Sequence, residues 1–370
     1  MRQDWDYKIL DEVGNINYGT RVVQKKDKGS SYYVYGGGGA TFMVDSYNRE
    51  DCFIVSRFAL SPKCTRYVKG RFFLNDSGLS VSTKTTYLTQ SFLDKALLAN
   101  NDVIYSMGKG LAQRNLDITS FKHLLIPIPP IDEQNTICSL LDNLNLVIEK
   151  KKVQIAELDK LVQSLFYDMF GDPINNPQGW EVKQFGEECT ELRYGTSRPA
   201  CENGQYKYLR MGNLTTSGHL DLTDLKTIDI PESEVDKCLV KYGDVLFNRT
   251  NSLDLIGKTC MFDLEEPMII AGYIIRVRLS DRLTPRYVSV AFNMPSMKNL
   301  LRKMAKGAVN QANINSKELA SIRIPVPPLP LQQSFAEKVE AIERQKELIN
   351  QSIKDVQTLF DAKMDYYFGD

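Results

Sequence analysis

An internal duplication is the feature that most constrains how this chain can fold. Residues 124–172 and 322–370 are two copies of one segment, at a constant offset of 198 positions (322 against 124) and without a gap. Each copy opens with a proline-rich stretch, Ile126-Pro-Ile-Pro-Pro130 or Ile324-Pro-Val-Pro-Pro328, and each ends in Phe-Gly-Asp. We therefore expect a pseudo-twofold internal repeat in which a globular part and a helix alternate twice.

The repeat restarts in each globular part. Trp5 and Lys8 are matched by Trp180 and Lys183, and the triplet Tyr18-Gly-Thr is matched by Tyr194-Gly-Thr. The offset is smaller here (180 against 5), so the second globular part carries about 23 extra residues. These boundaries predict globular domains over residues 1–128 and 173–326 and long helices over residues 129–172 and 327–370.

The two helical segments carry coiled-coil spacing. Their apolar residues follow one another at intervals of four and three, which is the seam of paired helices. Lys151 and Lys346 each interrupt one seam. Because the two seams match, we expect the helices to pair as an antiparallel coiled coil, in a fold of the α+β class. The apolar columns are Leu141, Ile148, Ile155, Val162 and Met169 with Ile137, Leu144, Leu158 and Leu165, and Phe335, Ile342, Ile349 and Val356 with Val339, Ile353, Phe360 and Tyr367.

Composition excludes several classes of protein. The chain has 370 residues, 42% of them hydrophobic, enough for more than one core. Its 7 cysteines show no CxxC pairing and only His123 and His219 accompany them, so neither a zinc site nor a disulfide framework is expected. No run of 18 apolar residues and no apolar signal core occur. We expect a reduced, cytoplasmic protein that does not bind membranes.

Charge separates the globular parts from the helices. Residues 1–131 hold 17 Lys and Arg against 12 Asp and Glu, and residues 180–328 hold 20 against 18. The helical segments 132–179 and 329–370 hold 4 against 8 and 5 against 8. This distribution is typical of globular parts that meet phosphates, although two ordinary solvated surfaces would also show it.

Basic, aromatic and amide side chains interleave in both globular parts. Arginine can bind guanine, and asparagine adenine, through two hydrogen bonds in the major groove. The alternative is that the asparagines form turns and that the arginines are solvated. The candidate DNA-binding residues are Tyr35, Arg57, Lys69, Arg71, Lys84, Arg198, Arg210, Asn213, Asn248, Arg249, Asn251 and Lys306.

Catalytic patterns are missing from the sequence. The glycines at 36–39 lack a following Lys-Ser/Thr, and Gly257-Lys-Thr259 has Ser252 where a phosphate-binding loop needs glycine. Asp172 with Glu181-Val-Lys183 is a poor match to a metal nuclease, because Asp172 is followed rather than preceded by proline. The Trp180 and Lys183 pair also recurs as Trp5 and Lys8. We expect a chain without catalytic residues, cofactor or bound metal.

The motifs together resemble the specificity subunit of type I restriction-modification systems. They are the paired proline-rich stretches followed by Gln134 and Gln332, the helices ending in Phe-Gly-Asp, Gly179-Trp180, the turn Tyr35-Gly-Gly-Gly-Gly39, and Gly243-Asp-Val-Leu-Phe-Asn-Arg249. The resemblance covers the whole chain. It implies two target recognition domains that read a bipartite, asymmetric site in double-stranded DNA.

The resemblance also implies partners. The helices would separate the two domains and dock two adenine methyltransferase subunits, which use S-adenosylmethionine, and a motor-nuclease restriction subunit could join them. A coiled-coil adaptor that tethers two protein-binding heads without DNA specificity is the alternative from another class, and an autonomous nuclease is a third.

Overall fold

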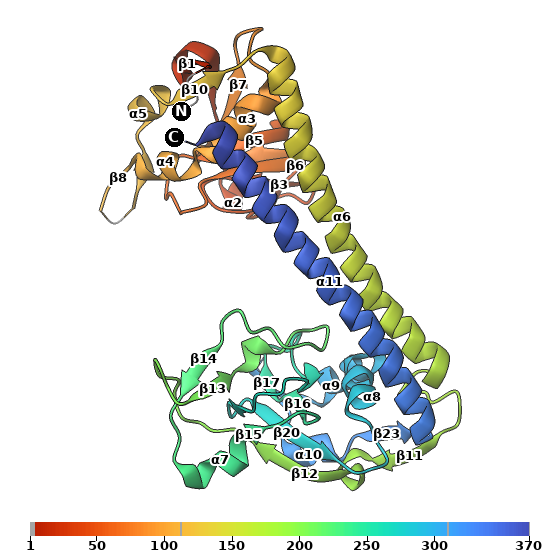
Figure 1. Cartoon of the computed structure of the whole chain (residues 1–370). Helices are drawn as coiled ribbons and strands as arrows, with labels where there is room; N and C mark the ends of the chain where they lie inside the picture. The colour runs from red at the N-terminus through yellow and green to blue at the C-terminus, as the bar shows by residue number, and fades with distance from the viewer. Residues whose placement is uncertain (1–3, 112, 309–310, 370) are drawn as a thin grey trace. The chain divides into compact units, whose positions relative to one another are not determined.

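The chain contains two compact units joined by long helices. The computed structural model describes residues 4–111, 113–308 and 311–369, so Asp370 at the end of the second repeat copy lies outside the described residues. Unit 1 comprises Met1–Lys152 with Gln351–Asp370, and unit 2 comprises Val153–Asn350 (Figure 1). The helices α6 (Ile131–Phe170) and α11 (Leu329–Phe368), of 40 residues each, contribute one part to each unit. The expectation of a mixed α and β fold with a pair of long helices is confirmed.

Unit 1 is built around a six-stranded sheet of order β2-β7-β5-β6-β3-β4. Neighbouring strands are antiparallel except for the parallel pair β3 and β6. The strands and short helices are β1 (Asp6–Ile9), α1 (Leu10–Val13), β2 (Gly14–Tyr18), α2 (Gln24–Asp27), β3 (Tyr32–Tyr35), β4 (Met43–Val44), β5 (Arg49–Ser56), β6 (Thr65–Leu74), β7 (Gly78–Thr83), α3 (Gln90–Ala99), α4 (Asn101–Ser106), β8 (Gly108–Lys109), β9 (Asn115–Leu116), α5 (Ile118–Lys122) and β10 (Leu125–Ile128).

The alternation of side chains along β5 divides the buried residues of unit 1 between the two faces of the sheet. Phe53 and Val55 lie in the main core, whereas Ile54 points to a smaller cluster on the other face. The main core also contains the buried face of α3, where Thr89 caps the helix by accepting a hydrogen bond from the Phe92 amide. Ile137 of α6 and further residues of both long helices complete it: Leu141, Phe360 and Met364.

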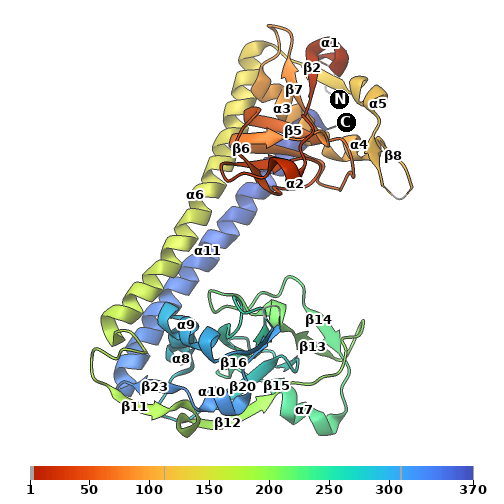
Figure 2. The same ribbon diagram turned by 180° about the vertical axis from the view of Figure 1, so that it is seen from behind.

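Unit 2 contains two four-stranded sheets, β12-β20-β16-β18 and β14-β13-β19-β15, and a three-stranded sheet β17-β22-β21. Figure 2 shows strands of the two larger sheets from behind. Its elements are β11 (Glu181–Gln184), a 3-10 turn (Phe185–Glu188), β12 (Cys189–Tyr194), β13 (Tyr206–Leu209), a 3-10 turn (Met211–Asn213), β14 (Lys226–Ile228), α7 (Glu232–Cys238), β15 (Leu239–Val240), β16 (Val245–Asn248), β17 (Thr250–Asn251), β18 (Thr259–Met261), β19 (Met268–Ile270), β20 (Ile274–Leu279), α8 (Pro285–Asn293), α9 (Pro295–Met304), β21 (Lys306–Ala308), β22 (Gln311–Asn313), α10 (Ser316–Ala320) and β23 (Arg323–Val326).

An aromatic cluster joins the long helices to the globular part of unit 2. The Tyr287 ring of α8 stacks on Phe166 of α6, with centroids 5.5 Å apart, and Phe335 of α11 packs edge-on against Phe166 at 5.7 Å. The Tyr287 hydroxyl donates to the Pro325 carbonyl at 2.9 Å. Burial of these rings fixes α8 against both helices within the unit.

A short antiparallel strand pair precedes each long helix. In unit 1, β1 pairs with β10 and places Lys8 opposite Ile126. In unit 2, β11 pairs with β23 and places Lys183 opposite Ile324. The same register therefore precedes both helices.

A buried glutamine lies in the first turn of each long helix, and both make the same three hydrogen bonds. Gln134 accepts from the Thr89 amide at 2.8 Å and donates to the carbonyls of Tyr87 and Pro129. Gln332 accepts from the Thr284 amide at 2.8 Å and donates to the carbonyls of Arg282 and Pro327. Both glutamines are 0% exposed. Thr89 and Thr284 cap α3 and α8, so each glutamine ties a capped helix to the start of a long one.

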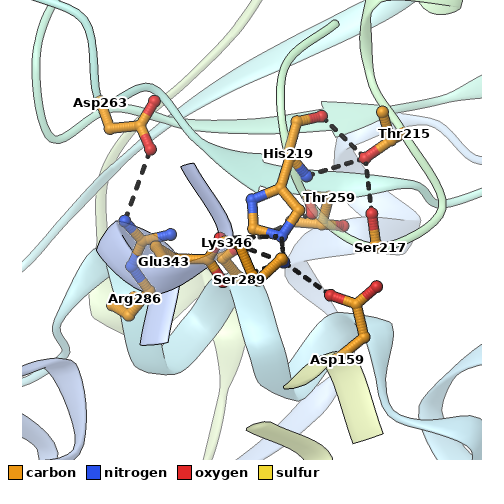
Figure 3. A network of polar contacts seen from close by, with 10 residues as sticks. All are labelled: Asp159, Thr215, Ser217, His219, Thr259, Asp263, Arg286, Ser289, Glu343 and Lys346. Carbon is orange, nitrogen blue, oxygen red and sulfur yellow. Dashed lines mark hydrogen bonds and ion pairs between the residues drawn. The ribbon is translucent and has the colours of Figure 1, made fainter. Parts of the chain in front are cut away.

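The lysine that interrupts the second apolar seam belongs to a polar network in unit 2. Lys346 of α11 is 6% exposed, and its Nζ lies 2.6 Å from an Asp159 carboxylate oxygen of α6 and 2.9 Å from His219 Nε2 (Figure 3). Glu343 also lies within 3.2 Å of the ammonium. Burial lowers the pKa of His219, and a neutral imidazole can accept a hydrogen bond from the ammonium. The network therefore holds the 215–219 loop against the helix pair, since the Thr215 hydroxyl bonds the His219 amide.

Candidate nucleic-acid interface

The fold of unit 2 brings together four of the residues that the sequence singled out. They line one open cavity of about 790 Å³. The contributing loops follow β12 and β13, lie at β16 and β17, and precede β18 and β20. Lys258 adds a fourth cation, and Asp224 is the acidic residue of the lining. The four predicted residues are Arg198, Arg210, Arg249 and Asn251.

Arg249 is held in this cavity by stacking and by backbone contacts. Its guanidinium carbon lies 4.8 Å from the centroid of the Tyr194 ring, and Nη1 donates to the Gly272 carbonyl at 3.2 Å. Its amide donates to the Tyr273 carbonyl, and its carbonyl accepts from the Ile314 amide, both at 2.9 Å. Two contacts of the guanidinium and two of the backbone thus hold Arg249 in place.

Arg198 and Arg210 are held by ion pairs at the same cavity. Arg198 forms a two-bonded pair with Glu234, at 2.7 and 3.1 Å, and this pairing lowers the pKa of Glu234. Arg210 lies 2.7 Å from an Asp224 carboxylate oxygen. Both arginines are partly exposed, so a DNA phosphate could replace the carboxylates at small cost.

Lys258 was not singled out from the sequence as a DNA-binding residue. Its Nζ donates to the Met211 carbonyl at 2.7 Å, and burial lowers its pKa. It belongs to Gly257-Lys-Thr259, whose spacing does not match a phosphate-binding loop. A single lysine before a short buried strand has no distinctive sequence pattern, so its place in the cavity could not be predicted from the sequence.

Two of the candidate asparagines hold loops together. Asn213 is 3% exposed; its oxygen accepts from the Arg210 amide at 2.8 Å and its amide donates to the Asp221 carbonyl. Asn248 is 0% exposed and donates to the carbonyls of Thr250 and Tyr273. The oxygen of Asn248 accepts from Asn251 at 3.0 Å. The Asn213 and Asn248 side chains are therefore occupied by their own loops, and Asn251 remains at the cavity surface.

Lys306 lies in β21 and does not line this cavity. Its side chain is 80% exposed, and its Nζ forms an ion pair with Glu318 at 2.6 Å. That pairing lowers the pKa of Glu318, which also accepts from the Asn315 amide at the start of α10.

In unit 1, Arg57 follows β5 and is held by aromatic rings. Its guanidinium carbon lies 4.9 Å from the Tyr18 centroid and 4.5 Å from the Phe58 centroid. Its carbonyl accepts from the Leu116 amide at 2.8 Å. Tyr18, like Tyr194, was noted in the sequence only as part of a repeated triplet, and the triplet itself was the available signal.

The other candidates of unit 1 lie in varied surroundings. Arg71 pairs with Glu50 at 3.2 Å and lies over the Tyr47 ring at 4.8 Å. Lys84 donates to the Asp11 carbonyl. Lys69 is exposed on β6, whereas the Tyr35 ring packs edge-on against Phe72 with centroids 5.4 Å apart.

A second open cavity, of about 360 Å³, lies in unit 1 and has acidic character. Glu50, Asp51 and Asp94 are among its lining residues, with Arg49 as the cation. Burial raises the pKa of Asp94 to about 6. This cavity contains none of the residues predicted to bind DNA, and its charge disfavours phosphate.

The chain belongs to the family of type I restriction modification DNA specificity domains, which its sequence matches over residues 2–160 and 177–358. Among individual proteins, it is similar to the EcoKI specificity subunit of Escherichia coli K12, a type I restriction enzyme subunit, with 28% identity over 255 residues, which cover 65% of this chain and 55% of that one. It is also similar to the putative MjaX specificity subunit of Methanocaldococcus jannaschii, with 28% identity over 191 residues, 50% of this chain and 44% of that one. The chain thus spans about half the length of these two relatives.

A solved structure supports the fold. The S subunit of a type I restriction-modification system from M. genitalium superposes with a TM-score of 0.58 at 15% identity, over 100% of this chain and 98% of that one. Among the described residues, none of the helices combines the length and the apolar character needed to cross a membrane.

Proposed function

We propose that this chain is a DNA specificity subunit that recognises a bipartite, asymmetric site in double-stranded DNA. The observation that carries the proposal is the basic cavity of unit 2, where Arg198, Arg210, Arg249 and Lys258 gather around one open surface. Clustered cations of this kind bind phosphates, and the arginines can also contact base edges. The names of the curated relatives, both specificity subunits, agree with it.

We propose that residues 1–128 and 173–326 are two target recognition domains of one internal repeat. The equal registers of the β1/β10 and β11/β23 pairs and the matched hydrogen bonds of Gln134 and Gln332 support this division. Segments 129–172 and 327–370 would pair as an antiparallel coiled coil and separate the domains. The two globular parts differ in their sheets and in their cavities, which supports recognition of two different DNA segments.

The chemistry would reside in partner proteins. We propose that adenine methyltransferase subunits, two of them, dock on the long helices, that a motor-nuclease restriction subunit can join, and that the complex acts in the cytoplasm. Exposed apolar side chains on α6 and α11 support docking, because a partner could bury them. They are Leu146, Val147, Val153 and Leu161 on α6 and Leu348 and Leu359 on α11. An adaptor without DNA specificity would leave the basic cavity without a role.

The test is the methylation motif of the assembled complex. The chain is combined with its methyltransferase subunits and offered a library of randomised duplexes, and the methylated duplexes are sequenced. We expect two defined segments separated by an unread gap of constant length, and no methyl transfer by the chain alone. Methylation without sequence preference, or a motif that persists when this chain is omitted, would contradict the proposal.

A further inference from the structure

A tyrosine occupies the same structural position in both units. Tyr18 and Tyr194 each precede Gly-Thr, and each threonine amide donates at 2.9 Å to the carbonyl of a strand residue, Leu74 or Ile270. The intervening glycines are required by close backbone packing. A Cβ on Gly19 would lie 1.9 Å from the Asn75 carbonyl oxygen, and one on Gly195 would lie 2.1 Å from that of Ile270. The same crossing of two backbone segments thus places both tyrosines.

An arginine at an equivalent position in each unit packs against this tyrosine: Arg57 against Tyr18 and Arg249 against Tyr194. Arg57 accepts a backbone hydrogen bond from Leu116, and Arg249 accepts one from Ile314. The two donors are 198 positions apart (314 against 116), which is the offset of the duplicated helical segments. The guanidinium carbons lie 4.9 and 4.8 Å from the tyrosine centroids. Guanidinium and ring therefore form a matched pair in each unit.

These two arginines differ from the other candidate arginines in their charge partners. Arg71, Arg198, Arg210 and Lys306 each form an ion pair with a carboxylate. Within the described parts of the chain, no carboxylate forms an ion pair with Arg57 or Arg249. In the same parts, Gly272 is the one acceptor for the Arg249 guanidinium, and none accepts from that of Arg57.

Stacking determines what such a group can bind. A guanidinium held against a ring keeps its plane fixed and loses little further rotamer freedom when its edge donors bind. The two parallel donors match the O6 and N7 acceptors of guanine in the major groove, whereas adenine presents a donor beside N7. Phosphate contacts do not need a fixed plane, and an 80% exposed side chain such as Lys306 suffices for them.

We infer that Arg57 and Arg249 each read one guanine, so that both segments of the DNA site contain a G·C pair recognised by the same device. Tyr18 and Tyr194 are positioning residues for these arginines. The Tyr194 hydroxyl is itself fixed, since it donates to Ser316 Oγ at 2.9 Å and accepts from the Ser316 amide at 2.8 Å. The inference rests on the proposed function and specifies the base that each unit recognises.

The experiment compares methylation motifs of complexes assembled with the full chain and its methyltransferase subunits. Arg249→Ala should reduce the preference for G at one position of one segment by about tenfold or more and leave the other segment unchanged. Arg57→Ala should reduce the preference for G in that other segment by a similar factor and leave the first segment unchanged. Arg→Lys variants keep the charge but lose the paired donors, so they should lose the same base preference. Tyr18→Phe should retain the preference that Tyr18→Ala weakens.

Arg114→Ala is the matched control. Arg114 also lies over a tyrosine, with 4.6 Å to the Tyr105 centroid, but its guanidinium donates to the carbonyls of Gly108 and Ser106. Its replacement should leave both segments of the motif unchanged.

Two outcomes would overturn the inference. One is a wild-type segment without a G·C pair; the other is a uniform loss of methylation in the arginine variants with unchanged base preferences, which would make these residues phosphate contacts. In both, the wild-type bipartite motif survives, so the proposed function stands. If an alanine variant does not assemble with the methyltransferase subunits, the base preference of the corresponding Arg→Lys variant tests the inference. Absence of any wild-type motif would instead reject the proposed function.

Discussion

Replacing Gln332 by leucine tests whether the buried glutamine holds α8 to the start of α11. Leucine has nearly the volume of glutamine but cannot form hydrogen bonds. The substitution removes three bonds of 2.8 to 2.9 Å, to the Thr284 amide and to the carbonyls of Arg282 and Pro327. The site is 0% exposed, so water cannot replace the lost partner without rearrangement.

The size of the effect follows from these three bonds. At about 0.5 to 1.5 kcal/mol for each, the free energy of unfolding should fall by about 1.5 to 4.5 kcal/mol. The loss should be local to unit 2, because Gln134 makes the equivalent bonds in unit 1.

Urea unfolding followed by circular dichroism measures the total loss, and hydrogen exchange read by mass spectrometry locates it. The peptide that contains the Thr284 amide should exchange faster in Gln332→Leu, and the one that contains the Thr89 amide should not. Gln333→Leu is the matched control, because Gln333 is the next residue of the same helix and is exposed. If the two variants unfold at the same urea concentration, the reasoning about the buried glutamine is wrong.

Two further predictions concern unit 2. Burial lowers the pKa of His219 below its ordinary 6.5. The charges of Lys346 and Arg286 lower this pKa further, whereas those of Glu343 and Asp159 raise it. As the pH falls, the unfolded chain therefore takes up the proton before the folded chain does. The His219 contribution to stability is therefore complete above pH 6.5 and is lost as the pH falls through the lower pKa of the folded state. The melting temperatures at pH 7.5 and 5.5 should differ less in His219→Gln than in the wild type. An equal difference would show that His219 is not the source of the pH dependence. Gly195→Ala would bring a methyl group to 2.1 Å from the Ile270 carbonyl oxygen and should lower the melting temperature by several degrees. Gly212→Ala is the control, because nothing lies within 4 Å of the added methyl group, and it should change the melting temperature little. Equal melting temperatures would contradict the close backbone packing at Gly195.

The sequence predicted the long helices but neither the sheets nor the strand pairs that precede the helices. Proline pairs and apolar spacing are local signals, and α6 begins at Ile131, directly after Pro130. The parallel pairing of β3 and β6 joins Val34 to Phe73, and no local pattern encodes such a distant contact. Lys346 was taken as an interruption of the seam because its partner His219 is 127 positions away.

The candidate residues were predicted by type, and the structure separates their roles. Arginine at 198, 210 and 249 was expected to be functional, and the fold gathers all three at one cavity. Asn213 and Asn248 were selected by the same reasoning but bond to their own loops. An asparagine that supports a loop and one that faces a ligand have the same sequence signature, so only burial distinguishes them.

The strand pair and the buried glutamine at the start of α6 form a joint between globular part and helix, and α11 starts with an equal joint. This equality affects how such a chain can evolve. Each joint consists of a strand pair in one register and one glutamine whose three hydrogen-bond partners are backbone atoms. Backbone atoms are present whatever the side chains are, so the residues between two joints can be replaced by a different sequence without loss of the attachment. Under the proposed function, a recombination event that exchanges one globular part would change the DNA specificity in a single step, while the attachment to the helices is inherited unchanged.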